Sequence, residues 1–208
     1  INNSGSASIS HILDTLPFVD RDLTKWKLYA YENGNYKYTP GTYMYSGRDC
    51  WWNRCTFCVW DNTINPLGSY RSFSPERLFA EVKHVVDKYG VKEIFDDAGT
   101  LFIGPRLKRF CELLIGSGYN KKVRYGCNMR FNALNQEYYD LMGKAGFRFI
   151  LYGMESGNQK TLDKLDKGTK EVKFKLKAIG PKTVYSTDIK PSVETDCKLP
   201  IVKLDEEQ

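Results

Sequence analysis

A short apolar stretch followed by an amphipathic stretch occurs four times in succession between residues 41 and 170, and this repetition limits the fold more than any other feature. The apolar stretches are residues 42–45, 91–95, 123–127 and 147–152. Residues at helical spacing follow over 74–90, 104–118, 135–146 and from Asn158 onward. Strands that alternate with helices form a parallel sheet with right-handed crossovers. The sequence therefore predicts an α/β fold, a partial (β/α) barrel of four recognisable units with a divergent C-terminal segment.

Polar or small residues come directly after each predicted strand. Three cysteines follow the first strand, Asp96 and Asp97 the second, Asn128 and Arg130 the third, and Glu155 and Ser156 the fourth. In a closed or partly closed barrel the carboxyl ends of the strands converge on one mouth. Any one of these groups alone is typical of a solvated loop, but together they predict a single site at that mouth.

The three cysteines are Cys50, Cys55 and Cys58, in the spacing C-x4-C-x2-C. Thiolates select iron–sulfur clusters, zinc and Cu(I) over hard cations. A structural zinc site takes four ligands, whereas a [4Fe–4S] cluster held by three cysteines has one iron without a protein ligand. That iron can bind a substrate or cofactor, so the spacing favours a chemical site over a structural one.

Two other interpretations of the cysteines are kept open. A zinc site would take its fourth ligand from Cys111, Cys127 or Cys197. A disulfide framework is typical of small, loop-rich proteins with little core, and a chain of 208 residues with 41% hydrophobic residues is not of that kind.

Composition narrows the range of partners. The net charge of +6 comes from 31 basic and 25 acidic residues, and many lysines fall within residues 160–182, a pattern that favours a solvated face. No aromatic-and-basic motif accompanies them, so a nucleic-acid partner is not expected. No apolar run is long enough to cross a membrane and residues 1–10 do not form a secretory signal. The spacing of the cysteines does not indicate a set of disulfide pairs, which fits free thiols in a reducing cytoplasm.

Three regions are expected along the chain. Residues 1–40 form an N-terminal lead and extension with a tyrosine-rich hairpin or loop over residues 31–40, residues 41–170 form the partial barrel, and residues 171–208 form a divergent C-terminal segment. That last segment is a degenerate fifth unit, a replacement for the final units, or a separate element, and replacement is favoured. Because a four-unit barrel exposes an apolar edge strand, we expect this segment or a partner chain to cover it.

Four stretches of the chain resemble the radical S-adenosylmethionine (SAM) superfamily, particularly its cobalamin-binding-type branch, with an atypical C-terminal end. They are residues 47–58 (GRDCWWNRCTFC), 96–100 (DDAGT), 126–131 (GCNMRF) and 153–157 (GMESG). The commonest spacing in the family is C-x3-C-x2-C, and the present spacing looks like the variant with paired tryptophans. The resemblance covers roughly residues 11 to 170.

The resemblance implies a role for each matching residue. Cys50, Cys55 and Cys58 would hold a [4Fe–4S] cluster whose fourth iron binds SAM. Phe57 would lie near the adenine, and Asp96, Asp97, Ala98 and Gly99 would receive the SAM amino group through their backbone. Asn128 and Arg130 would approach the ribose or the carboxylate, and Glu155 and Ser156 would face SAM. The alternatives are that Phe57 is a core residue and that Arg130 is the partner of a structural acid.

The resemblance also implies an activity and partners. A radical SAM enzyme cleaves SAM reductively to a 5′-deoxyadenosyl radical, which acts on a small-molecule or peptide substrate. A reductant protein such as flavodoxin or ferredoxin would supply the electron. A cobalamin domain would lie outside these residues or on a partner chain, or this member lacks one. Two alternatives are a catalytically inactive, truncated relative that acts as a binding or assembly subunit, and a zinc-binding structural module.

Overall fold

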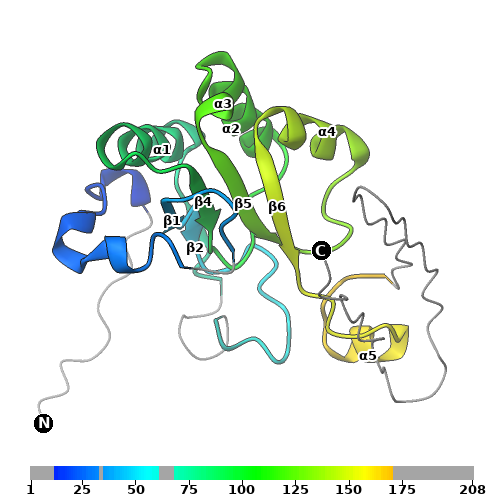
Figure 1. Cartoon of the computed structure of the whole chain (residues 1–208). Helices are drawn as coiled ribbons and strands as arrows, with labels where there is room; N and C mark the ends of the chain where they lie inside the picture. The colour runs from blue at the N-terminus through cyan, green and yellow to red at the C-terminus, as the bar shows by residue number, and fades with distance from the viewer. Residues whose placement is uncertain (1–11, 33–34, 61–67, 171–208) are drawn as a thin grey trace, which may run out of the picture.

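A four-stranded parallel sheet forms the centre of the computed structural model, which describes residues 12–32, 35–60 and 68–170. In order across the sheet, the strands are β1 (Gly41–Met44), β4 (Glu93–Asp96), β5 (Arg124–Met129) and β6 (Phe147–Tyr152) (Figure 1). A short antiparallel pair, β2 (Gly47–Arg48) and β3 (Arg71–Ser72), brackets the loop that carries the cysteines. All four predicted strands are therefore present, and the third extends to include Asn128 and Met129.

Helices separate consecutive strands of the parallel sheet. They are α1 (Pro75–Tyr89), α2 (Pro105–Gly116), the short α3 (Tyr119–Lys122), α4 (Gln136–Lys144) and α5 (Gln159–Lys164). Three 3₁₀ turns precede the sheet: η1 (Leu13–Thr15), η2 (Arg21–Thr24) and η3 (Trp26–Leu28). Ser74, Asn135 and Asn158 cap α1, α4 and α5, because each side chain accepts a hydrogen bond from a backbone N–H of the first turn.

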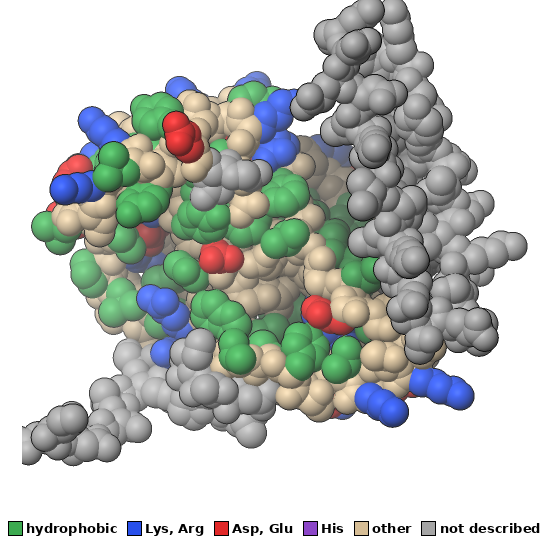
Figure 2. All heavy atoms as spheres, turned by 60° about the horizontal axis from the view of Figure 1, so that its bottom comes forward, with side chains coloured by type: hydrophobic (Ala, Val, Ile, Leu, Met, Phe, Trp, Pro, Cys, Tyr) green, Lys and Arg blue, Asp and Glu red, His purple; other side chains and the backbone are tan. Residues whose placement is uncertain are grey.

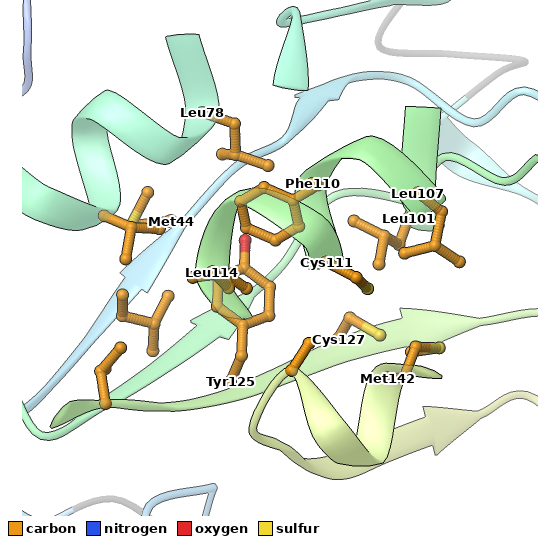
Figure 3. Packing of buried hydrophobic residues seen from close by; sticks show 14 of the residues in the cluster. Met44, Leu78, Leu101, Leu107, Phe110, Cys111, Leu114, Tyr125, Cys127 and Met142 are labelled. Atoms are coloured by element: carbon orange, nitrogen blue, oxygen red, sulfur yellow. The ribbon is translucent and has the colours of Figure 1, made fainter. Parts of the chain in front are cut away.

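The hydrophobic core lies between the sheet and the helices α1, α2 and α4, all on one face (Figure 1). Figure 3 shows Phe110 of α2 at the centre of this layer, against Tyr125 of β5, with Leu78 of α1 above. The rings of Phe110 and Tyr125 are 5.3 Å apart and meet edge to face. Covering one face with helices leaves the other face of the sheet to form the inside of the barrel.

The inner face of the sheet is aromatic at its middle level. Tyr43, Phe95 and Phe149 come from β1, β4 and β6. The ring centroid of Phe95 is 5.6 Å from that of Tyr43 and 5.8 Å from that of Phe149. Gly126 of β5 lies beneath them, and a Cβ there would come within 3.1 Å of the Phe95 ring. With helices on one face and side chains layered on the other, the predicted partial (β/α) barrel is confirmed.

The amino end of the inner face is closed by the chain itself. Glu93 is 1% exposed, and its carboxylate accepts hydrogen bonds from the backbone N–H groups of Lys37 (2.7 Å) and Tyr38 (2.8 Å). Arg148 of β6 pairs with the other oxygen of Glu93. The Tyr36 ring lies directly over Gly41. We call these residues the barrel floor. Because they close the amino end of the strands, the carboxyl end is the open mouth of the barrel.

Residues 12–30 cover the outer edge of β1. Arg21 is buried and donates from Nε to Thr42 Oγ1 (2.8 Å) and from Nη2 to the Tyr43 carbonyl (2.9 Å). Residues 31–32 and 35–40 contain no strand, so this part of the predicted hairpin or loop is a loop. The predicted covering of the β6 edge involves residues 171–208, which lie outside the described residues. The three-region division stays a prediction.

Candidate cofactor site

A cavity of about 340 Å³ lies at the carboxyl ends of β4, β5 and β6. Its lining includes five residues predicted from the sequence: Cys50, Cys55, Gly99, Asn128 and Arg130. Figure 2 views the molecule from the side where these strands end, and hydrophobic side chains are spread over this face while Lys and Arg lie mainly at its margin. The sheet topology thus brings residues up to 80 positions apart to one cavity, as expected for a barrel mouth.

The three cysteines lie on one loop and are all partly exposed. Cys50 and Cys55 line the cavity, and Cys58 follows through a turn in which its N–H donates to the Cys55 carbonyl (3.2 Å). Within the described residues, no three His, Cys, Asp or Glu side chains are grouped so as to bind a single metal ion.

The start of the cysteine loop is fixed by a buried aspartate. Asp49 is 2% exposed and has a φ of 67°, in the left-handed region. Its carboxylate accepts a hydrogen bond from Ser69 Oγ and faces Arg71 of β3 at 3.5 Å. On the other side, a Cβ at Gly99 would lie 3.0 Å from the Cβ of Cys50. The first cysteine is therefore held between the end of β4 and the β2–β3 pair.

The rest of the loop is fastened to residues 164–168, which we call the closing segment. Trp52 Nε1 donates to the Asp166 carbonyl (2.8 Å), and the Thr56 N–H donates to the Leu165 carbonyl (3.0 Å). Arg54 also forms an ion pair with the Asp166 carboxylate at 2.9 Å. The closing segment follows α5, so the last described unit of the barrel completes the cysteine loop.

Arg130 lies where the cysteine loop, β5 and the closing segment meet. Its guanidinium carbon is 3.8 Å from the ring centroid of Trp52, and Nη1 donates to the carbonyls of Lys167 (3.1 Å) and Gly168 (2.7 Å). Within residues 12–32, 35–60 and 68–170, no acid forms an ion pair with Arg130, so the described structure gives no support to the alternative that it pairs with a structural acid. Burial lowers the pKa of Arg130, and the nearby thiols of Cys50 and Cys55 act in the opposite direction.

The predicted segment 96–99 divides into an inner and an outer part. Asp96 is 1% exposed, and its carboxylate accepts from Ser46 N (2.9 Å), Ala98 N (3.2 Å) and Tyr125 Oη (2.8 Å). Burial raises the pKa of this carboxyl group, and the three hydrogen bonds oppose that shift. The Asp96 side chain therefore shapes the turn, while Gly99 alone of these four residues lines the cavity.

Asn128 connects this turn to β5. Its Nδ2 donates to Asp97 Oδ1 and to the Ala98 carbonyl, both at 3.1 Å. The side chain also lines the cavity. Asp97 and Ala98 are thus held beside the cavity by Asn128 without lining it.

The remaining predicted residues lie at or beyond the rim. Phe57 is 46% exposed, so its alternative interpretation as a core residue is wrong, and its ring lies 5.6 Å from Lys167 Nζ. Lys167 lines the cavity and forms an ion pair with Glu155 at 2.9 Å. Ser156 Oγ accepts from the Asn158 N–H and so belongs to the turn before α5. Neither Glu155 nor Ser156 lines the cavity.

The sequence assigned no role to seven of the residues that line the cavity: Trp52, Thr100, Met129, Leu151, Tyr152, Gly153 and Lys167. Gly168, which lies against Trp52, had no predicted role either. Trp52 lies between the first two cysteines, in the stretch of residues 47–58 that resembles the superfamily, but neither its type nor its position indicates a contact with Arg130. Lys167 falls within the lysine-rich part of the chain, where a solvated face was expected. Gly168 has a φ of 62°, and a Cβ there would come within 1.9 Å of the Trp52 ring. A glycine opposite a tryptophan 116 positions away leaves no local sequence signal.

A partial (β/α) barrel with three cysteines on the loop after its first strand is typical of enzymes that bind a metal cofactor through thiolates. The family model of the radical SAM superfamily matches residues 44–180, so the chain belongs to that superfamily. Among curated proteins, an anaerobic magnesium-protoporphyrin IX monomethyl ester cyclase of Cereibacter sphaeroides is 28% identical over 153 residues, which cover 72% of this chain. The chain spans only 24% of that relative's length.

The fold agrees with that of the solved structure of TsrM. The radical S-adenosylmethionine methyltransferase TsrM of Kitasatospora setae, with tryptophan substrate and a SAM analogue bound, has a TM-score of 0.51 and 15% identity over 59% of this chain and 23% of its own. The cobalamin-dependent S-adenosylmethionine radical enzyme OxsB, with aqua-cobalamin bound, has a TM-score of 0.49 and 24% identity over 62% of this chain and 20% of its own. The match of the family model over residues 44–180 confirms the predicted superfamily. None of the described helices is both long and apolar enough to span a membrane.

Proposed function

We propose that this chain is the SAM-cleaving part of a radical SAM enzyme, with a [4Fe–4S] cluster held by Cys50, Cys55 and Cys58. The observation that carries the proposal is that Cys50 and Cys55 open onto the same cavity as Gly99, Asn128 and Arg130, at the mouth of the barrel. Membership of the radical SAM superfamily supports the same assignment.

The residues around the cavity fit such a cluster. Three thiolates and a bound carboxylate ligand bring negative charge, and Arg130 and Lys167 supply positive charge on the cavity wall. Gly99 leaves room where the backbone of the β4 turn meets Cys50. When bound, the cluster supplies the electron for reductive cleavage of SAM to methionine and a 5′-deoxyadenosyl radical.

The chain's own groups would bind and orient SAM. We assign the SAM amino group to the backbone of the turn that contains Asp96, Asp97, Ala98 and Gly99, where Asn128 donates to the Asp97 carboxylate and to the Ala98 carbonyl. Phe57 has an exposed ring that can cover an adenine. Glu155 and Ser156 would act from the rim, Glu155 through its ion pair with Lys167. The barrel floor and the aromatic inner layer keep water from reaching the cavity from behind.

The reaction of the complete protein is a further proposal, because the chain spans a quarter of its curated relative. The relatives are named as a cyclase of a porphyrin ester and as a methyltransferase, so a small-molecule or peptide substrate is proposed. An electron donor such as flavodoxin or ferredoxin is required by the chemistry. Cobalamin, bound in solved structures of both OxsB and TsrM, would be bound outside the residues described. Cluster thiolates favour a reducing compartment such as the cytoplasm.

The test is anaerobic reconstitution with iron and sulfide, followed by electron paramagnetic resonance (EPR) of the reduced protein with and without SAM. A [4Fe–4S] signal that changes on adding SAM is expected. A cluster whose EPR signal does not change on adding SAM would favour the inactive, truncated relative. Bound zinc without an iron–sulfur cluster would favour the zinc-binding structural module.

The ligands are tested by replacing Cys50, Cys55 and Cys58 together with Ala. Iron content should fall to the background level while the helical circular dichroism stays unchanged, because the three side chains are partly exposed and outside the core. Cys111→Ala is the matched control, since Cys111 is fully buried on α2. Retention of a four-iron cluster in the triple variant would contradict the assignment.

A further inference from the structure

Arg130 is the most tightly fixed cation in the cavity wall. Both hydrogen bonds from its Nη1 go to backbone carbonyls of the closing segment, and its planar group lies on Trp52 with Trp51 at 5.2 Å. A guanidinium held by stacking and by two carbonyls cannot swing across the cavity to a ligand. Its position is therefore a property of the assembled site.

Among the described residues, the titratable groups near Arg130 are the thiols of Cys50 and Cys55. Arg130 lines the same cavity as Cys50 and Cys55. No carboxylate in the described parts of the chain forms an ion pair with it. Its Nε is buried and donates to no group among the described residues. A buried donor without an acceptor costs free energy, so an acceptor is expected when the site is loaded.

We infer that Arg130 acts on the cluster and not on SAM: Trp52 and the carbonyls of Lys167 and Gly168 fix its charge beside Cys50 and Cys55, where it favours the reduced state. The inference rests on the proposed function. Reduction adds one negative charge to a cluster held by three thiolates, and hydrogen bonds and charge near the sulfurs set its potential. The cysteine loop, Trp52 and the closing segment then serve one purpose, which is to hold this charge in place.

The expected effect is large enough to measure. Unit charges a few ångströms apart near a protein surface interact by several kcal/mol, and partial exposure reduces this. We expect removal of the charge to lower the ratio of reduced to oxidised cluster on the order of tenfold at a fixed potential. For a one-electron couple this corresponds to a midpoint about 59 mV lower.

The experiment is an EPR-monitored redox titration of reconstituted protein carrying Arg130→Gln, Arg130→Lys or Arg124→Gln. Arg130→Gln should lower the midpoint, and Arg130→Lys, which keeps the charge, should lie close to the wild type. Arg124→Gln is the matched control: it removes one positive charge from the opposite end of β5, where Arg124 donates to the Asn120 carbonyl. It should leave the midpoint unchanged. In the protein without iron, only Arg130→Gln and Arg130→Lys should alter the tryptophan bands of the near-ultraviolet circular dichroism.

An unchanged midpoint in Arg130→Gln with an intact cluster would overturn the inference. So would a variant that keeps the midpoint but weakens the spectral response to SAM, because Arg130 would then contact SAM. If Arg130→Gln takes up no cluster, uptake by Arg130→Lys supports the inference, whereas failure of both overturns it in favour of a purely structural clamp. Failure of the wild type to bind a cluster would instead refute the proposed function.

Discussion

Replacing Gly168 by Ala should detach the closing segment from the cysteine loop. Gly168 has a φ of 62°, and an added Cβ would come within 1.9 Å of Cζ2 of Trp52. No rotation of an alanine side chain relieves this contact, so either Trp52 or the closing segment must move. Movement of Trp52 breaks its hydrogen bond to Asp166 and its contact with Arg130.

The cost can be summed from three contributions. A residue with a Cβ in the left-handed region costs about 1–2 kcal/mol. Loss of one hydrogen bond costs about 1 kcal/mol, and loss of a cation–π contact about 0.5–1 kcal/mol. The total is about 3 kcal/mol, which corresponds to a fall in Tm of about 6–12 °C in a domain of this size.

Urea unfolding of the iron-free protein measures this cost, and the rate at which a chelator removes iron from the loaded protein provides a second readout. The second readout is needed because a segment that opens locally reports only its own opening free energy in global unfolding. Gly157→Ala is the matched control, since a Cβ there meets no atom within 4 Å. The reasoning is refuted if Gly168→Ala and Gly157→Ala have the same stability and the same rate of iron loss.

Two further perturbations test other parts of the structure. Glu93→Gln should destabilise the protein by about 2 kcal/mol in urea unfolding, because the ion pair with Arg148 is lost inside the barrel floor; exposed Glu137→Gln is the control, and equal effects of the two would contradict the floor. Burial raises the pKa of the Cys111 thiol to about 12. Because the folded pKa lies above the unfolded value of about 8.5, the resulting stability is complete below about pH 8.5 and is lost as the pH rises towards 12. Alkylation of Cys111 in the folded protein, followed by mass spectrometry, should therefore stay flat between about pH 7 and about pH 10, and a rise to the rate seen in urea would disprove the burial effect.

The regular elements could be predicted because their signals are local. Ser74 and Pro75 mark the start of α1, and Gly90 ends it in the left-handed conformation. The same holds for the strands, of which β6 has the predicted bounds Phe147–Tyr152. Periodicity and capping depend on residues within a few positions of one another, so a single sequence contains the information.

The site was predicted in part. Cys50, Cys55, Gly99, Asn128 and Arg130 were placed correctly at the mouth because each follows or ends a strand and the topology brings strand ends together. The turn residues could not be separated in the same way. Whether Asp96 points into the cavity or into the protein depends on Tyr125, which lies 29 positions further on and donates to it.

Contacts across long sequence separations were the part that could not be predicted. The role of Lys167 depends on Glu155 and on the path of the chain after α5. The barrel floor depends on Glu93 meeting a segment 55 positions earlier and an arginine 55 positions later. A local pattern contains no trace of such partners, although an isolated acid at the start of an apolar strand, as at Glu93, is an unusual residue to bury without one.

The closing segment is synthesised long after the cysteine loop, so the site can be completed only late in folding. Trp52 and Arg54 leave the ribosome more than a hundred residues before the Asp166 groups that fix them. Contacts of such high sequence separation form late in folding. At the usual pace of translation, on the order of 5–20 residues per second, the cysteines wait several seconds or more in an unfinished loop. If Cys50, Cys55 and Cys58 hold the proposed cluster, metal delivered before that moment would meet three thiols without a complete pocket, so we expect the cluster to be loaded after the closing segment has been made.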